Sequence, residues 1–168
     1  MPSLVIHPAS IKDVLSIVKV RLGAFTEEEV YGFIVPGESL YTSIEKLRHM
    51  WDKENFLKDG LEVFVAEFKA KVVGFIVYNM KSSDDNIDNV VVTKEEQGKG
   101  VGRALVEYVE ELAKSRGFSV MKTDTTENAE GISCEAIGFW RRIGYQDVGE
   151  SVATEYGFKV IPLVKKLN

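Results

Sequence analysis

Hydrophobic positions recur along this chain with two spacings, and each spacing predicts one kind of element. The clearest helical segment follows Gly100, where apolar side chains recur every three or four positions. The positions that make this stripe are Val101, Ala104, Leu105, Tyr108, Val109, Leu112 and Ala113. Arg116 places a cation in the last turn and Gly117 a glycine after it, both typical of a helix end. The pattern predicts an amphipathic helix that starts after Gly100 and ends at Arg116.

Three other segments have helical spacing. The first begins after Ser10, which has Asp13 three places later in a pattern close to a capping box, and runs to about Leu22. The second has one apolar stripe, made by Leu40, Ile44, Leu47 and Trp51. The third spans residues 132 to 143 and ends at Gly144.

Short apolar or alternating runs predict strands between these helices. Two runs separated by Phe68-Lys69-Ala70-Lys71 read as an antiparallel hairpin. The predicted strands are 4–7, 63–66, 72–78, 87–92, 120–123, 145–149 and 158–164. The chain shows no repeat or linker, so we expect one domain over residues 3–168, of mixed α/β or α+β class.

Composition narrows the classes of function. The formal net charge is −5, from 26 acidic against 21 basic residues, which argues against nucleic-acid binding through the phosphate backbone. A single cysteine, Cys134, allows no internal disulfide, and with only His7 and His49 to join it a metal site is not expected. No apolar run approaches the ~20 residues that span a bilayer, and the N-terminus lacks the pattern of a signal peptide. We therefore expect a cytoplasmic protein without a membrane partner.

The segment before the main helix carries the candidate chemistry. A strand with three valines, Val90, Val91 and Val92, leads to Gln97-Gly98-Lys99-Gly100-Val101-Gly102-Arg103, and the helix starts there. Glycines let the backbone approach a ligand, and the first turn of a helix offers unpaired N–H groups at a positive dipole end. Lys99 and Arg103 add positive charge. Together these features predict a cradle for a pyrophosphate.

Known phosphate loops can be compared position by position. The Walker pattern GxxxxGK[ST] is absent, and GxGxxG fails because Arg103 stands where its third glycine would be. The segment resembles the Q/RxxGxG/A acyl-CoA motif of the GNAT superfamily of N-acetyltransferases at every defined position. The order of predicted elements over nearly the whole chain is also similar to that family. A tight strand-to-helix connection without a ligand is the alternative reading of the glycines.

The resemblance implies a fold and a ligand. The fold is a single domain with a mixed, mostly antiparallel central sheet flanked by helices, in which the fourth and fifth strands splay apart. Acetyl-CoA is the implied co-substrate, with no metal. Its pantetheine arm would lie against the backbone of Val90, Val91 and Val92, and residues Gln97 to Arg103 would hold its pyrophosphate.

A second landmark departs from the family pattern. Many members have a tyrosine that protonates the departing thiolate, where this chain has Trp140 in Ala136-Ile137-Gly138-Phe139-Trp140. Tryptophan has an N–H donor but is no acid near neutral pH. An asparagine that often contacts the coenzyme is replaced by Ser133. Trp140 is expected either to contact the cofactor together with Ser133 or to be a core residue of its helix.

The resemblance also directs attention to carboxylates near the fourth strand. An amine must lose its proton before it attacks, and a base on that strand is common in the family. Asp88 is our first candidate; in a regular strand it shares a face with Asn86 and Val90, and a bulge would reset that parity. Glu67 is the second candidate for the base. Tyr145 is a candidate substitute for the missing acid, beside Tyr78 and Tyr156, which the sequence does not rank.

The expected activity is transfer of the acetyl group of acetyl-CoA to a primary amine by direct attack in a ternary complex. The acceptor would be a small amine, a polyamine, or an amine of a peptide or protein. The alternatives are a catalytically degenerate acyl-CoA-binding or sensing domain and a domain that binds no CoA. The aromatic segment from Phe25 to Leu57 suggests either a partly apolar acceptor pocket or a homodimer surface.

Overall fold

A computed structural model describes residues 3–24, 60–80, 86–127, 135–153 and 159–168 of the chain. Its helices are η1 (Ile11–Asp13), α1 (Val14–Ala24), η3 (Lys94–Glu96), α4 (Val101–Ser115) and α5 (Glu135–Arg142). Its strands are β1 (Val5–Pro8), β2 (Leu61–Phe68), β3 (Lys71–Asn79), β4 (Asn86–Val92), β5 (Val120–Glu127), β6 (Gln146–Asp147), β7 (Val152–Ala153) and β8 (Lys159–Lys166).

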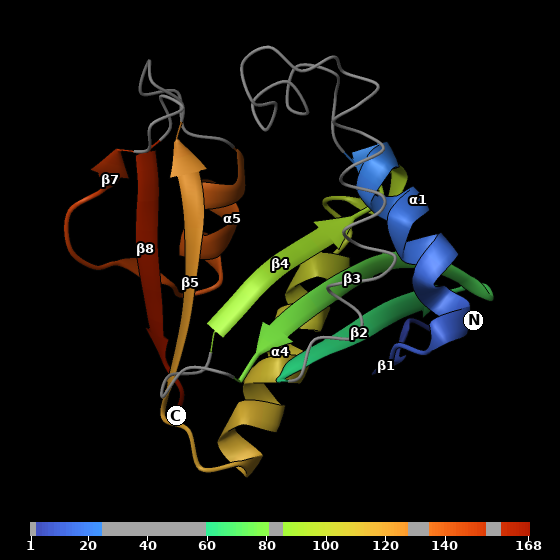
Figure 1. The fold of residues 1–168 in the computed structure, drawn as a ribbon, viewed down its shortest axis with the longest axis horizontal. Coiled ribbons are helices and arrows are strands. Elements are labelled where there is room, and N and C mark those ends of the chain that lie inside the picture. The colour runs from blue at the N-terminus through green and yellow to red at the C-terminus, as the bar shows by residue number, and fades with distance from the viewer. Residues whose placement is uncertain (1–2, 25–59, 81–85, 128–134, 154–158) are drawn as a thin grey trace.

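The strands form one mixed sheet in the order β1-β2-β3-β4-β5-β8-β6, and β7 also pairs with β8. Every pairing is antiparallel except that of β4 with β5. The parallel pair holds only at its beginning, where Asn86 and Ile87 face Lys122 and Thr123. Beyond this point the strands diverge into a V (Figure 1). The expected fold class, including the splayed fourth and fifth strands, is confirmed.

The hairpin of β2 and β3 has the turn that its sequence predicts. Lys69 and Ala70 both adopt left-handed backbone conformations, with φ of 52° and 58°. Two consecutive residues with positive φ form the type of turn that matches the twist of paired strands. Phe68 and Lys71 close the register on either side of it.

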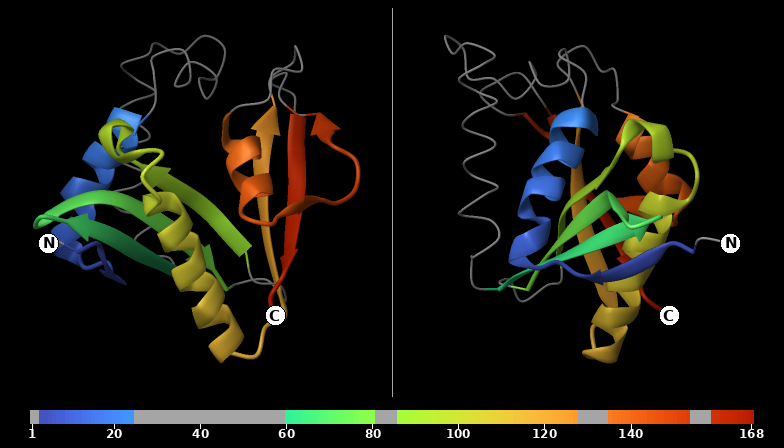
Figure 2. Two further views of the ribbon diagram at one scale, coloured as in Figure 1. Left: turned by 180° about the vertical axis from the view of Figure 1, so that it is seen from behind. Right: turned by 90° about the vertical axis from the view of Figure 1, so that its right-hand side faces the viewer.

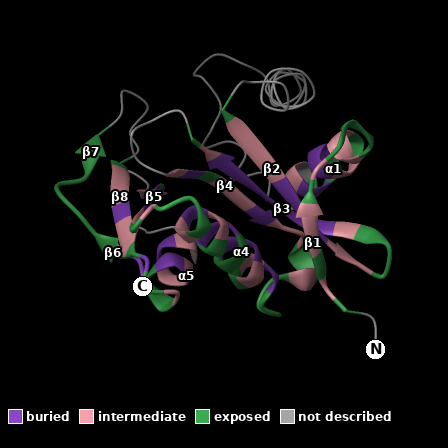
Figure 3. Cartoon of the chain, turned by 90° about the horizontal axis from the view of Figure 1, so that it is seen from below, coloured by how far each residue is buried: buried purple, intermediate pink, exposed green. Residues whose placement is uncertain are grey.

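Helices cover both faces of the sheet (Figure 2). On one face α1 buries Ile17 and Val18 against Phe75, Val77 and Val91 of the central strands. The opposite face carries α4 and α5, and there the larger core forms. This core includes Leu105, Val109, Ile76, Ile87, Met121 and Trp140. Figure 3 shows that the buried positions concentrate on the central strands, while β6 and β7 are exposed.

The helices and strands predicted within the described residues are present, and the short strand β7 is one that the sequence did not predict. The predicted helix with Leu40 and Trp51 lies outside the described residues, as do the first residues predicted for α5. Within the part of the chain that is described, no helix is long and apolar enough to cross a membrane.

Candidate functional site

The free edge of β4 is the main feature of the V. Thr93 donates its backbone N–H to the carbonyl of Val73 at 2.8 Å, and Val91 stands opposite Phe75. In an antiparallel ladder alternate residues point their backbone groups to the same neighbour. Val91 therefore pairs with β3, whereas the N–H and C=O groups of Val90 and Val92 point to the side where β5 has moved away. Among the described strands nothing pairs with this edge beyond Ile87.

The segment from Gln97 to Arg103 continues this edge into α4. The Gln97 side chain donates from Nε2 to the Val92 carbonyl at 3.0 Å, which ties the loop to the end of the strand. Gly98 and Gly100 have φ of 74° and 90°, in the left-handed region that favours glycine. Gly100 is the N-cap of α4, so the unpaired N–H groups of the first helical turn begin directly after it.

Gly102 serves a different purpose from the two glycines before it. A Cβ at this position would lie 3.4 Å from the Phe139 ring and 3.6 Å from a Val92 methyl group. A methyl group here would make ordinary van der Waals contact, so Gly102 marks the place where α4 packs against α5 and β4. Val101 is buried in the core, so only its backbone faces outward as a binding group.

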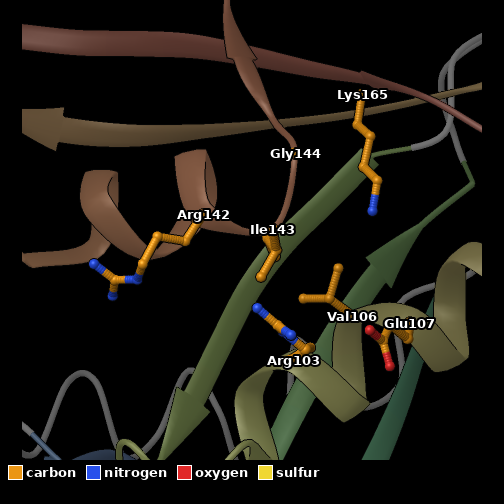
Figure 4. Close-up of a pocket in the computed structure, with 7 residues that line it drawn as sticks. All are labelled: Arg103, Val106, Glu107, Arg142, Ile143, Gly144 and Lys165. Carbon is orange, nitrogen blue, oxygen red and sulfur yellow. The ribbon is translucent and has the colours of Figure 1, made fainter.

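The charges around the loop are partly compensated. Lys99 forms an exposed ion pair with Glu96 at 3.3 Å. Arg103 lines a hollow between α4 and the end of α5, together with Arg142, Lys165 and Glu107 (Figure 4). Lys165 is already paired with Glu110, so the two arginines supply most of the positive charge of this hollow. The loop and the adjoining hollow form a mildly cationic surface next to the V.

Asp88 lies where the V begins. The register of β3 and β4 shifts between Val77 and Tyr78, and this bulge leaves Asp88 without a Cα partner on β3. The side chain is exposed and accepts hydrogen bonds from Asn86 Nδ2 at 2.6 Å and from Asn79 Nδ2 at 3.0 Å. Val90 packs against the core on the α4 face, so the bulge does reset the alternation along β4. Asp88 thus lies on the face of the sheet opposite to α4.

A second carboxylate, which the sequence analysis did not single out, faces Asp88 from the other strand. Thr123 is paired with Ile87 and donates its hydroxyl to the Ile87 carbonyl at 2.9 Å, so Asp124 follows directly across the divergence. The pKa of the Asp124 carboxyl is raised above its ordinary value, first by loss of water around it and then by the charge of Asp88. No sequence motif marks Asp124; only the pairing of β4 with β5 brings it to this place.

Tyr145 lies apart from this group. It is 2% exposed, and its hydroxyl donates to Glu110 Oε1 at 3.0 Å. Lys165 Nζ completes the arrangement with contacts of 2.7 and 3.0 Å to the same carboxylate. Burial raises the pKa of Tyr145 strongly, and the charge and the hydrogen bond of Glu110 raise it further. This environment favours a structural role and does not favour proton donation to a leaving thiolate.

Glu67 is also separate from Asp88. It stands opposite Val72 at the hairpin end of β3, whereas Asp88 lies beside Tyr78, six positions along that strand. At roughly 3.3 Å per residue this is a separation of about 20 Å. Glu67 instead lies 3.8 Å from His7 of the edge strand β1. The structure does not bring the two candidate bases to one site.

Trp140 is 6% exposed and belongs to the main core. Its ring packs edge-on against Tyr145 and Phe139, at centroid distances of 4.9 and 5.1 Å. This packing favours the core role over a broad contact with the cofactor. Ser133, Cys134 and Tyr156 lie outside the described residues. No group of three or more His, Cys, Asp or Glu residues in the described ranges is arranged to hold a metal ion.

The profile of the acetyltransferase (GNAT) domain matches residues 59–147, which is more than half of the chain. The chain belongs to the GNAT acetyltransferase family. An uncharacterized N-acetyltransferase of Chlorobaculum tepidum is 29% identical to this GNAT chain over 98 residues, 56% of each protein. The chain spans about half the length of the curated relatives that it matches.

Solved GNAT structures share the fold over nearly the whole chain. The PaiA N-acetyltransferase of Thermoplasma acidophilum, solved with coenzyme A, has a TM-score of 0.69 and 18% identity, and covers 98% of this chain and 99% of its own. An aminoglycoside 6′-N-acetyltransferase solved with coenzyme A has a TM-score of 0.71 and 16% identity, with 98% and 97% covered. At this identity the structural similarity shows only that the fold is shared. Membership of the family supports an acyltransferase as the class of enzyme.

Proposed function

We propose that this GNAT domain transfers the acetyl group of acetyl-CoA to a primary amine by direct attack in a ternary complex. The observation that carries the proposal is the free edge of β4, which runs directly into a glycine loop at the start of α4. An extended ligand with amide groups followed by a pyrophosphate has the chemistry that such an edge and loop would bind. The two coenzyme A complexes among the structural neighbours support this choice of ligand.

In this proposal each segment contacts a different part of the coenzyme. The backbone N–H and C=O groups of Val90 and the N–H of Val92 bind the pantetheine arm as a neighbouring strand would, since the Val92 carbonyl already accepts from Gln97. The backbone groups of Val91 are bonded to β3, so this residue only keeps Val90 and Val92 in place on the strand. The N–H groups from Gly98 to Arg103 and the positive end of α4 bind the pyrophosphate. Lys99 and Arg103 add charge from the rim.

The proposed base is Asp88. An ammonium with the ordinary lysine pKa of about 10.4 must give up its proton at a cost of roughly 4.6 kcal/mol at pH 7, whereas an α-amine near 7.8 costs about 1 kcal/mol. Asp88 accepts this proton, directly or through water, and the amine nitrogen bonds to the thioester carbonyl carbon. The C–S bond then breaks and the thiolate leaves. Glu67 is too distant along β3 to share this role with Asp88.

The leaving group needs little help from an acid. A thiol with a pKa of about 8.5 is a good leaving group, and the thiolate can take its proton from the attacking nitrogen or from water. This route fits a chain in which Trp140 replaces the family tyrosine and the hydroxyl of Tyr145 is engaged by Glu110. Tyr145 is therefore the weakest of the three catalytic candidates.

A thiol-release assay over small amines, polyamines and peptides tests the proposal. We expect turnover on at least one class, with about a hundredfold loss of kcat in Asp88→Asn if the carboxylate is the general base. Asp147→Asn, which removes an exposed carboxylate paired with Arg141, is the matched control and should keep its rate.

The buried Trp140 and the engaged Tyr145 also favour a second candidate, a catalytically degenerate domain that binds or senses acyl-CoA. Saturable acetyl-CoA binding with no turnover over the whole panel would select this candidate and refute the enzymatic one. Absence of any binding would refute both.

A further inference from the structure

Both oxygens of the Asp88 carboxylate are held by side-chain amides. Asn86 Nδ2 donates to Oδ1 at 2.6 Å, and Asn79 Nδ2 donates to Oδ2 at 3.0 Å. The two asparagines come from different strands and face each other directly in the register of β3 and β4. Asp88 is two positions after Asn86 and on the same face of the strand, so it reaches both of them. The three side chains form an amide clamp, by which we mean Asn79, Asn86 and the carboxylate between them.

The clamp fixes an exposed side chain that would otherwise rotate. An Asp carboxylate turns about two side-chain bonds, and an exposed one has no packing to select a rotamer. Hydrogen bonds to both oxygens from two different strands define its orientation. Each oxygen keeps further acceptor capacity, because an ionised carboxylate has about four lone-pair sites in total.

The two donors to Asp88 are neutral amides, which affect its charge differently from a cation. A cation beside a carboxylate, such as Arg141 beside Asp147 at 2.6 Å, neutralises its charge. The amides of Asn79 and Asn86 carry no charge, so they orient Asp88 and leave its charge available to an ammonium. Three charged residues lie on the adjacent strand β5. Asp124 faces Asp88 across the divergence, Lys122 stands opposite Asn86, and Glu127 is at the far end of the strand.

We propose that Asn79 and Asn86 are positioning residues that hold Asp88 in the orientation needed to take the proton of the incoming amine. This inference rests on the proposed function, because it assigns a role to two residues in that reaction. The proton moves from the amine nitrogen to an Asp88 oxygen, and no group of the asparagines is consumed or charged.

The test compares Asn79→Ala and Asn86→Ala with the wild type on two accepted amines of different basicity. At pH 7 we expect kcat to fall about tenfold in each variant on an amine with an ordinary pKa near 10, of which about a thousandth is free base. The loss should be much smaller on an amine with a pKa near 8, of which about a tenth is already free base. The KM for acetyl-CoA should stay within about twofold, because neither asparagine lies on the proposed coenzyme path. A merely structural role would lower the rate on both amines alike.

Asn89→Ala is the matched control. Asn89 is on the same strand one position after Asp88 and stands opposite Val77, and its side chain makes no hydrogen bond to Asp88 among the described residues. It should not change the ratio of rates on the two amines. Crystal structures of the variants give a readout independent of activity, in which Asp88 should leave its single orientation when either amide is removed.

The outcomes separate the two proposals. Wild-type protein that acetylates no amine refutes the proposed function, and an Asp88 that keeps its orientation in both variants then refutes the positioning role as well. Active wild-type protein whose Asn79→Ala and Asn86→Ala variants match Asn89→Ala refutes the positioning role alone. Equal losses on both amines also contradict it.

Discussion

Replacing Gly100 by alanine should weaken coenzyme A binding through the backbone alone. Gly100 has φ of 90°, and nothing lies within 4 Å of the place where a Cβ would stand. An added methyl group meets no neighbour, so the cost is that of holding an L-residue in a left-handed conformation, about 1–2 kcal/mol. If the free loop of the variant relaxes out of this conformation and the bound loop needs it, the strain arises on binding. The dissociation constant for coenzyme A should then rise about 5- to 30-fold.

Titration calorimetry with coenzyme A measures this change, and Gly117→Ala is the control. Gly117, after the other end of α4, has φ of 88° and equally open surroundings. Gly117→Ala should lower the thermal stability and leave the affinity unchanged. Gly100→Ala should lower the affinity and change the thermal stability of the free protein less, because its strain arises on binding. Gly100→Asn should bind better than Gly100→Ala, because asparagine tolerates the left-handed region.

The reasoning fails if Gly100→Ala binds coenzyme A as tightly as the wild type. It also fails if Gly117→Ala weakens binding to the same extent, since the effect would then reflect general destabilisation and not the shape of the loop.

Three further predictions concern charges around the V and the core. Tyr145→Phe should cost about 1–2 kcal/mol near neutral pH by removing the donor to Glu110. The pKa of Tyr145 is raised above its ordinary 10.0 in the folded state. The contribution of Tyr145 to the free energy of unfolding should therefore be lost from the wild type as the pH rises above 10. Urea unfolding measures this loss, which the variant should not show. Lys165→Met should cost about 2–4 kcal/mol at neutral pH, since it leaves the buried Glu110 carboxylate without its cation, and a loss below 1 kcal/mol would contradict this account. Asp124→Asn should stabilise the protein at pH 7, because the pKa of Asp124 is raised above 3.8 in the folded state. The gain should vanish as the pH falls below 3.8 in the same unfolding assay.

Local patterns in the sequence predicted the elements whose formation depends on near neighbours. The stripe from Val101 to Ala113 predicted α4, and the two apolar runs on either side of Phe68-Lys69-Ala70-Lys71 predicted the hairpin. The divergence of β4 from β5 was expected only from the resemblance to the family. Hydrophobic periodicity does not show which strands become neighbours in space when a helix separates them.

The groups around the candidate site were harder to predict. Asp88 was found as a strand carboxylate that shares a face with Asn86, but its second amide partner, Asn79, depends on the register of β4 with β3. Asp124 is brought to Asp88 by strands that lie 36 positions apart in sequence. Tyr145 looked available as an acid because the sequence does not show that Glu110, 35 positions earlier, binds its hydroxyl in the core.

The central claim is that coenzyme A lies along the free edge of β4 and ends on the glycine loop. A crystal structure of the protein with acetyl-CoA tests it directly. We expect pantetheine amides hydrogen-bonded to the backbone of Val90 and Val92, and pyrophosphate oxygens bound by N–H groups between Gly98 and Arg103. A coenzyme bound elsewhere, or a V whose β4 edge stays free at saturating acetyl-CoA, would contradict the account.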